Sequence, residues 1–209
     1  MLGRSGLVKS SVKVYTGKES YHVKLGGLHC ELPLVNVSPH LWIASDAELI
    51  LGDVEFICAA AELLAKKLSG RRTDVVLTAE AKSIALAYEL SKRLGHGHFI
   101  VARKSLKAYM GDHISQKLRS ITTNSDQELV LTKGEMTHLS GKNVCLLDDV
   151  VSTGGTLEAL EELVAEAGGI VACRAAIWRE GPWYKGSDLV YVDTLPVFVD
   201  QNSPLAAQI

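Results

Sequence analysis

The stretch that decides the fold of this chain is Val144-Cys145-Leu146-Leu147-Asp148-Asp149-Val150-Val151-Ser152-Thr153-Gly154-Gly155-Thr156. An apolar run leads into two carboxylates and then into small hydroxyl and glycine residues. The spacing of apolar residues over 157–167 is that of an amphipathic helix. The order predicts a strand buried on both faces of a parallel sheet, a loop at its carboxyl end, and a helix.

The loop has the composition of an anion site. Gly154 and Gly155 permit backbone conformations closed to other residues, so the N–H groups of 152–156 can converge on a phosphate at the helix N-terminus. Asp148 and Asp149, just before it, can accept hydrogen bonds from a vicinal diol or hold a divalent cation. The alternative is a plain strand-turn-helix, but two adjacent acids at a strand end serve no packing purpose. We therefore expect a phosphorylated sugar as ligand.

This string resembles the phosphoribosyl pyrophosphate (PRPP) motif of type I phosphoribosyltransferases, and all thirteen positions fit. The resemblance covers about residues 74–193 and is closest to the adenine/xanthine phosphoribosyltransferase-like branch. It implies transfer of the 5-phosphoribosyl group from PRPP to a purine base, adenine favoured, with release of pyrophosphate, in purine salvage. It also implies Mg²⁺ as cofactor and a homodimer. The alternatives are a PRPP-binding regulator without turnover and a xanthine- or guanine-specific enzyme.

The resemblance also implies roles for individual residues. The groups expected to act in catalysis are Asp148, Asp149 and Lys107, and the first two would also be the metal ligands. The 5-phosphate would be bound by Ser152, Thr153, Gly154, Gly155 and Thr156. Pyrophosphate would be bound by Ala81, Lys82, Ser83, Arg103 and Lys104, and the base by Trp178 and Arg179.

Each of the outlying positions has a plainer interpretation. Lys82 can instead be a solvated lysine in the first turn of a helix, and Arg103 and Lys104 can be ordinary surface charge. Trp178 ends an apolar run and can belong to the core. Adenine members of the family carry a glutamate in a Tyr-Ser-Leu-Glu-like segment of the lid, whereas residues 120–124 here read Ser-Ile-Thr-Thr-Asn, with Thr123 or its neighbours in place of that glutamate.

The rest of the chain alternates between strand and helix patterns. Residues 12–37 predict β structure with a hairpin at Gly26-Gly27, and Asp46 can cap one long helix that runs to about residue 68. Strands are predicted at 74–78, 99–102, 170–178 and 189–192, and helices at 84–94 and 157–167. This alternation predicts an α/β fold, a doubly wound and mostly parallel sheet with an N-terminal β/α hood. We expect the hood to be residues 1–60 and the phosphoribosyltransferase core to be 61–209.

Residues 103–142 interrupt the alternation with a connection too long for neighbouring core strands. We expect a flexible lid there, in which 120–123 pair with 127–131 and leave 104–117 as a mobile arm. A surface loop without a catalytic role is the alternative.

Composition sets the remaining limits. The 209 residues are 47% apolar with a net charge of -2, which suits a globular domain and gives no footprint for nucleic acid or an anionic membrane. No run approaches the roughly 20 apolar residues of a membrane span. The four cysteines stand apart without metal-site spacing, and we expect free thiols and a cytoplasmic location.

Overall fold

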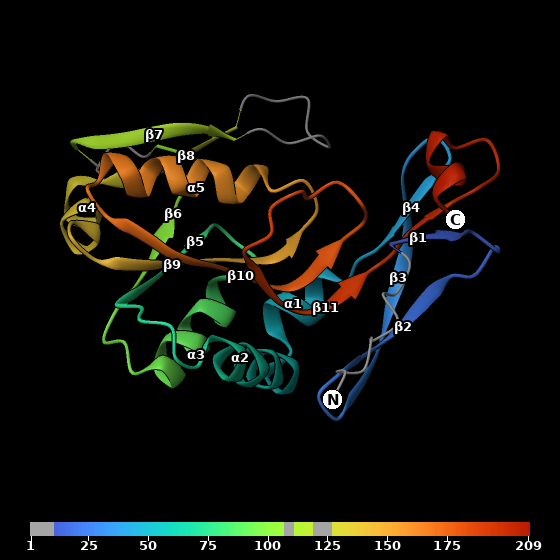
Figure 1. Ribbon diagram of the computed structural model, residues 1–209, viewed down its shortest axis with the longest axis horizontal. Helices are drawn as coiled ribbons and strands as arrows, with labels where there is room; N and C mark the ends of the chain where they lie inside the picture. The colour runs from blue at the N-terminus through green and yellow to red at the C-terminus, as the bar shows by residue number, and fades with distance from the viewer. Residues whose placement is uncertain (1–10, 107–110, 119–126) are drawn as a thin grey trace, which may run out of the picture.

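Five parallel strands form the central sheet of the protein, in the order β11-β10-β9-β5-β6 (Figure 1). The computed structural model describes residues 11–106, 111–118 and 127–209. The strands are β5 (Val75–Ala79), β6 (Phe99–Ala102), β9 (Asn143–Val151), β10 (Ile170–Glu180) and β11 (Leu189–Leu195). Strand β9 pairs with β5 and β10, and its side chains from Val144 to Leu147 are fully buried. The predicted parallel strand is confirmed, although it continues through both aspartates to Val151.

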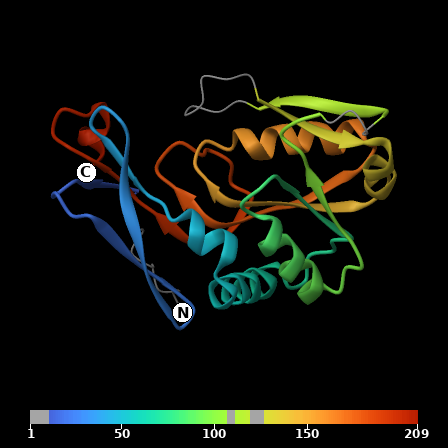
Figure 2. The same cartoon turned by 180° about the vertical axis from the view of Figure 1, so that it is seen from behind.

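Helices cover both faces of this sheet. Figure 2 shows α2 and α3 on one face and α5 on the other. The helices are α2 (Val54–Leu68), α3 (Ile84–Leu94), α4 (Lys133–Leu139) and α5 (Gly155–Glu166). Two clusters of buried apolar side chains, one on each face, join the helices to the strands. The doubly wound α/β fold expected from the sequence is therefore confirmed. Within the described ranges, no helix is long and apolar enough to cross a membrane.

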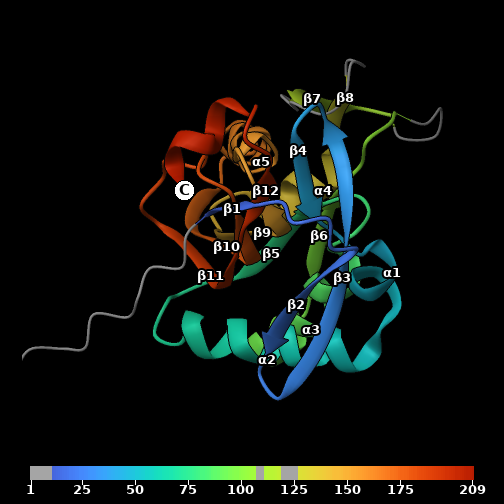
Figure 3. The same ribbon diagram turned by 90° about the vertical axis from the view of Figure 1, so that its right-hand side faces the viewer.

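A second sheet forms the hood, seen face-on in Figure 3. Its order is β1-β12-β4-β3-β2, and all neighbours are antiparallel except β1 and β12. The strands are β1 (Val12–Val14), β2 (Ser20–Leu25), β3 (Leu28–Ser38), β4 (Leu41–Ala44) and β12 (Val197–Val199), and a 3-10 helix, η1 (Pro204–Gln208), follows. Strand β12 comes directly after the core strand β11. The hood is thus built from both ends of the described chain.

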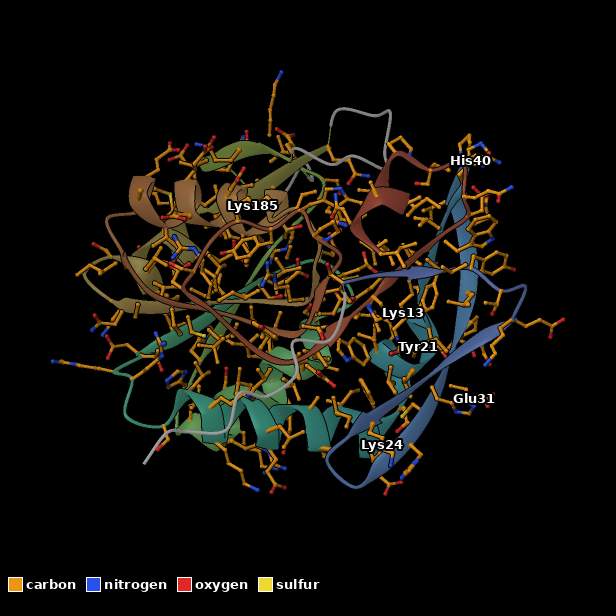
Figure 4. The ribbon with its side chains drawn as sticks, turned by 45° about the vertical axis from the view of Figure 1, so that its right-hand side comes forward. Lys13, Tyr21, Lys24, Glu31, His40 and Lys185 are labelled. Atoms are coloured by element: carbon orange, nitrogen blue, oxygen red, sulfur yellow. The ribbon has the colours of Figure 1, made fainter. Side chains whose placement is uncertain are left out.

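Side-chain contacts, most of them aromatic, connect strands of the hood sheet that are distant in sequence. The rings of Tyr15 and Trp42 stack with centroids 4.0 Å apart, and Tyr21 meets Phe198 edge-on at 5.2 Å. Lys13 Nζ donates to the Tyr21 hydroxyl at 3.1 Å, a pair that joins β1 to β2 (Figure 4). Phe198 lies in β12, so its contact with Tyr21 links the C-terminal strand β12 to the N-terminal strand β2.

The region before residue 68 departs from the prediction of one long helix. It forms two helices, α1 (Ala47–Gly52) and α2. Asp46 caps the first by accepting from Leu49 N at 3.1 Å, and Asp53 caps the second by accepting from Phe56 N at 2.8 Å. Because the second cap holds an extended backbone, it divides the pattern at Gly52. The expected hood boundary at residue 60 falls inside α2.

The predicted hairpin in the lid has a different partner strand. Strand β8 (Gln127–Thr132) pairs antiparallel with β7 (His113–Leu118), which falls in the segment expected to be a mobile arm. The pairing of 127–131 with 120–123 was therefore wrong, and residues 120–123 lie outside the described residues. Figure 1 shows β7 and β8 beside α5, where Ile114 packs against the core cluster.

Candidate active site

A cavity of about 430 Å³ lies between the carboxyl edge of the central sheet and the hood. The core supplies a polar side from three segments: 79–83 at the end of β5, Lys104 after β6, and 148–156, which is the end of β9 with the loop that follows it. The hood and α1 supply an apolar side, made of Leu32, Val37, Leu41, Ile43, Ala44 and Ile50. Such a cavity suits a ligand with one highly polar end and one flat apolar end.

The loop 152–156 lines the polar side of the cavity. It leads into the first turn of α5, so its N–H groups stand at a helix N-terminus and favour an anion. Gly154 has φ of +97°, and a Cβ there would lie 2.8 Å from Cδ2 of Tyr184. Only glycine meets both conditions, because other residues rarely adopt this φ and the tyrosine ring leaves no room. The predicted phosphate-binding residues Ser152, Thr153, Gly154, Gly155 and Thr156 all line the cavity.

Two carboxylates stand directly before this loop. Ser83 Oγ donates to Asp148 at 3.5 Å and to Asp149 at 3.3 Å, and Lys82 Nζ lies 3.8 Å from Asp149 Oδ2. Burial and the neighbouring Asp149 carboxylate raise the pKa of Asp148 well above its ordinary value. Asp149 Oδ2 is buried and accepts no hydrogen bond from the described residues. The pair therefore offers acceptor oxygens to a ligand hydroxyl or a cation.

The loop after β5 brings positive charge to the same place. Ala81, Lys82 and Ser83, the residues expected to bind pyrophosphate, line the cavity, and the Glu80–Ala81 peptide is cis. The Glu80 carboxylate accepts from Lys104 N at 3.0 Å, which ties this loop to the end of β6. Lys82 and Lys104 are thus placed where a second anionic group would lie.

The structure separates Arg103 from Lys104. The guanidinium of Arg103 pairs with Glu135 at 2.8 Å and does not line the cavity. Its backbone bridges to Val130, so the residue joins β6 to the β7–β8 hairpin. Lys107, expected to act from the lid, lies outside the described residues.

The end of β10 lines the junction between the polar and apolar sides. Trp178 is 1% exposed and packs on Phe56 with ring centroids 5.5 Å apart, so it belongs to the core, and it also lines the cavity. Arg179 points to the opposite face of the strand, donates to the Tyr184 carbonyl at 2.9 Å, and does not line the cavity. The expectation that Arg179 contacts the base is not supported by this placement.

Two residues of this segment were missed from the sequence. Glu180 is 7% exposed and lines the cavity, and so does Trp183. Burial raises the pKa of Glu180 to about 7, a hydrogen bond from Ser152 opposes the rise, and the Asp149 carboxylate adds to it. The available signal was alternation: Glu180 shares the face of Trp178 two residues earlier, and an acid on a buried face needs a reason.

The described residues contain no group of three or more His, Cys, Asp or Glu side chains arranged to hold a metal ion by themselves. The two adjacent aspartates nevertheless suit Mg²⁺ coordination, since Mg²⁺ is commonly bound by one or two protein carboxylates together with phosphate oxygens of a substrate.

Comparison with known proteins identifies the family to which the chain is similar. The phosphoribosyl transferase domain family matches residues 50–207. An adenine phosphoribosyltransferase from a Thermoanaerobacter species is 34% identical over 131 residues, 60% of this chain and 69% of that protein. The purine biosynthesis transcriptional repressor of Bacillus subtilis is 32% identical over 123 residues, 59% of this chain and 42% of the repressor.

A solved structure agrees with these relatives. The crystal structure of adenine phosphoribosyltransferase from Thermoanaerobacter pseudethanolicus superposes with a TM-score of 0.64 at 25% identity, over 78% of this chain and 95% of that one. The N-terminal strands β1–β4 precede the family match, which begins in α1. Since that match spans most of the chain and includes each loop of the cavity's polar side, the chain belongs to the phosphoribosyl transferase domain family, in its adenine phosphoribosyltransferase-like branch.

Proposed function

We propose that the protein transfers the 5-phosphoribosyl group from PRPP to a purine base, with adenine favoured, and releases pyrophosphate. The observation that carries the proposal is the two-sided cavity. A phosphate loop, a carboxylate pair and two lysines face an apolar wall that ends in two tryptophans. PRPP and a purine differ in the same way, one multiply charged and the other flat and aromatic.

The polar side supports a role for each loop. The N–H groups and hydroxyls of 152–156 suit the 5-phosphate, and Asp148 and Asp149 suit the ribose hydroxyls. Departure of pyrophosphate builds positive charge on the ribose and negative charge on the leaving group, as in glycosyl transfer generally. The carboxylates would favour the first and Lys82 with Lys104 the second. Arg103 has less to contribute, since Glu135 already engages it.

Magnesium fits as cofactor, held by Asp148 and Asp149 together with PRPP. Asp149 Oδ2 is buried and accepts no hydrogen bond from the described residues, and its cationic neighbour Lys82 Nζ stays 3.8 Å away, so this oxygen is available as a direct ligand. When bound, the ion supplies positive charge that offsets the charge of pyrophosphate.

The apolar side supports adenine. An oxygen at position 6 of a purine requires a hydrogen-bond donor such as Arg or Lys. Arg179, which directly follows Trp178 in the sequence, does not line the cavity. Adenine can instead be held by stacking and by backbone groups in an apolar pocket. The relatives named above include adenine phosphoribosyltransferases.

The decisive experiment measures pyrophosphate release with PRPP, Mg²⁺ and, in turn, adenine, hypoxanthine, guanine, xanthine, uracil and orotate. We expect turnover with adenine ahead of every other base. A preference for xanthine or guanine that disappears in Arg179→Ala would favour the 6-oxopurine alternative and would mean that Arg179 turns into the cavity.

A second candidate is a PRPP-binding regulator without turnover, which the likeness to the Bacillus subtilis repressor favours. Tight PRPP binding in calorimetry without turnover of any base would select it. We further propose a homodimer, tested by sedimentation, and a cytoplasmic location. The second is supported by the cysteines, because Cys30, Cys58, Cys145 and Cys173 are all free thiols.

A further inference from the structure

The buried carboxyl group of Glu180 lies beside the aromatic lining of the cavity. It ends β10 on the same face as Trp178, two residues earlier. The ring of Trp183 lies against the next residue, since a Cβ at Gly181 would be 2.5 Å from Trp183 Cζ3. All three side chains line the cavity. The carboxyl group is therefore flanked by the two tryptophans on which a flat base would lie.

The opposite neighbour of Glu180 is the phosphate loop. Ser152, the first residue of that loop, interacts with the carboxylate and lowers its pKa. The Lys82 ammonium lies 3.8 Å from the carboxylate of Asp149. Glu180 thus stands where the loop that holds the sugar phosphate meets the wall that receives the base. In the proposed reaction the anomeric carbon connects the sugar phosphate to the base, so we expect it at this junction.

The charged groups around Glu180 come from several elements. Burial raises its pKa to about 7, the Ser152 hydrogen bond and Lys82 act against the rise, and Asp149 adds to it. The other charged residues that line the cavity are Asp46, Glu80, Lys104 and Asp148. A carboxyl group in such surroundings exchanges its proton near neutral pH, the condition under which acid–base catalysis is most effective.

The proposed reaction, on which this inference rests, requires a proton acceptor. A ring nitrogen of the base forms a bond to the anomeric carbon, and the bond from that carbon to pyrophosphate breaks with its electron pair leaving on pyrophosphate. The nitrogen that attacks carries a hydrogen, and the neutral nucleotide base forms only when that proton departs.

We propose that Glu180 is the catalytic residue that accepts this proton, with Ser152 holding its carboxylate in place. The carboxylate becomes a carboxylic acid as the nitrogen–carbon bond forms, and it returns the proton to water after the products leave. Asp148 and Asp149 are less suited to this role, because Ser83 and Lys82 already contact them and the proposed function assigns them to the ribose hydroxyls and Mg²⁺.

The test compares Glu180→Gln with wild type, because glutamine keeps the size of the side chain and can still accept from Ser152. We expect kcat with adenine to fall about 100-fold or more, the lower end of typical acid–base contributions. The limb of the kcat profile that rises with pH near neutrality should disappear. PRPP affinity in calorimetry should change less than about twofold. The matched control is Glu162→Gln, an exposed glutamate on α5, whose kcat and pH profile should equal those of wild type.

Three results would overturn the inference: an unchanged kcat in Glu180→Gln, a retained pH limb, or a loss of PRPP binding that accounts for the defect. The last would make the residue a support for the phosphate loop. Glu180→Asp, which keeps a titrating group, should lower kcat but retain the pH limb, so it provides the test if the glutamine variant does not fold. Wild-type turnover itself separates the two ideas, because absence of turnover with every base would reject the proposed function as well.

Discussion

Replacing Gly154 by alanine is expected to destabilise the fold and weaken PRPP binding together. The residue has φ of +97°, a conformation that costs a non-glycine residue about 1–2 kcal/mol. The added methyl group would lie 2.8 and 2.9 Å from two carbons of the Tyr184 ring, and overpacking of this kind costs about 1–3 kcal/mol. Together the free energy of unfolding should fall by about 2–5 kcal/mol. In a chain of this size each kcal/mol lowers Tm by about 2–4 °C.

Thermal unfolding measures the loss, and calorimetry with PRPP and Mg²⁺ measures the effect on the phosphate loop. The control is Gly134→Ala in α4, where a Cβ meets only Thr132 Oγ1 at 4.0 Å, and which should leave Tm unchanged or raise it. The double variant Gly154→Ala/Tyr184→Leu gives the methyl group room and should recover the packing part but not the backbone part. A Gly154→Ala protein with wild-type Tm and PRPP affinity would refute the contact between Tyr184 and the loop.

The other predictions concern the carboxylates and the ligand. Asp148→Asn and Asp149→Asn should each lower turnover tenfold or more, because each loses a charged hydrogen bond worth about 1.5–3 kcal/mol. Circular dichroism should show an intact fold in both variants. Full activity in both variants would exclude the two carboxylates from catalysis. PRPP with Mg²⁺ at about 100 times its dissociation constant should add roughly 2.7 kcal/mol of stability, and an unmoved Tm at millimolar ligand would contradict the site. The pKa of Glu180 is raised from 4.5 to about 7, so the folded state binds its proton more tightly; this stabilisation is complete below about pH 4.5 and is lost as pH rises through about 7. Denaturant titrations should therefore show Glu180→Gln with a flatter pH dependence over that window, by up to about 3 kcal/mol, and parallel curves for variant and wild type would contradict the shift.

The sequence predicted the core well because its signals are local. The strand, loop and helix around Asp148 follow one another without interruption, and each apolar run of the central sheet is long enough to identify alone. Helix α3 and strand β6 begin and end at the residues predicted for them, since Gly95 closes the helix in a left-handed conformation that few other residues adopt. These elements position the loops of the polar side.

The hood was predicted only in part, because its final arrangement depends on contacts between distant segments. Strand β12 has three residues, and its partners β1 and β4 lie more than 150 positions away, so no window of sequence reveals the pairing. The break between α1 and α2 was missed for a different reason. The apolar residues before and after Asp53 fit the pattern of one continuous helix. Only the hydrogen bond from Phe56 N to the Asp53 side chain shows where the second helix starts.

The two sides of the cavity therefore differ in how closely sequence can specify them. The polar side consists of short loops at the ends of neighbouring parallel strands, where a motif determines both the residues and their position. The apolar side is assembled from β3, β4, α1 and the end of β10, and its shape depends on how these elements pack. Reaction class follows from the first side and choice of base from the second. Substitutions among Leu32, Leu41 and Ile43 should accordingly change which base is accepted while the loops that bind PRPP remain intact, because none of these residues belongs to those loops.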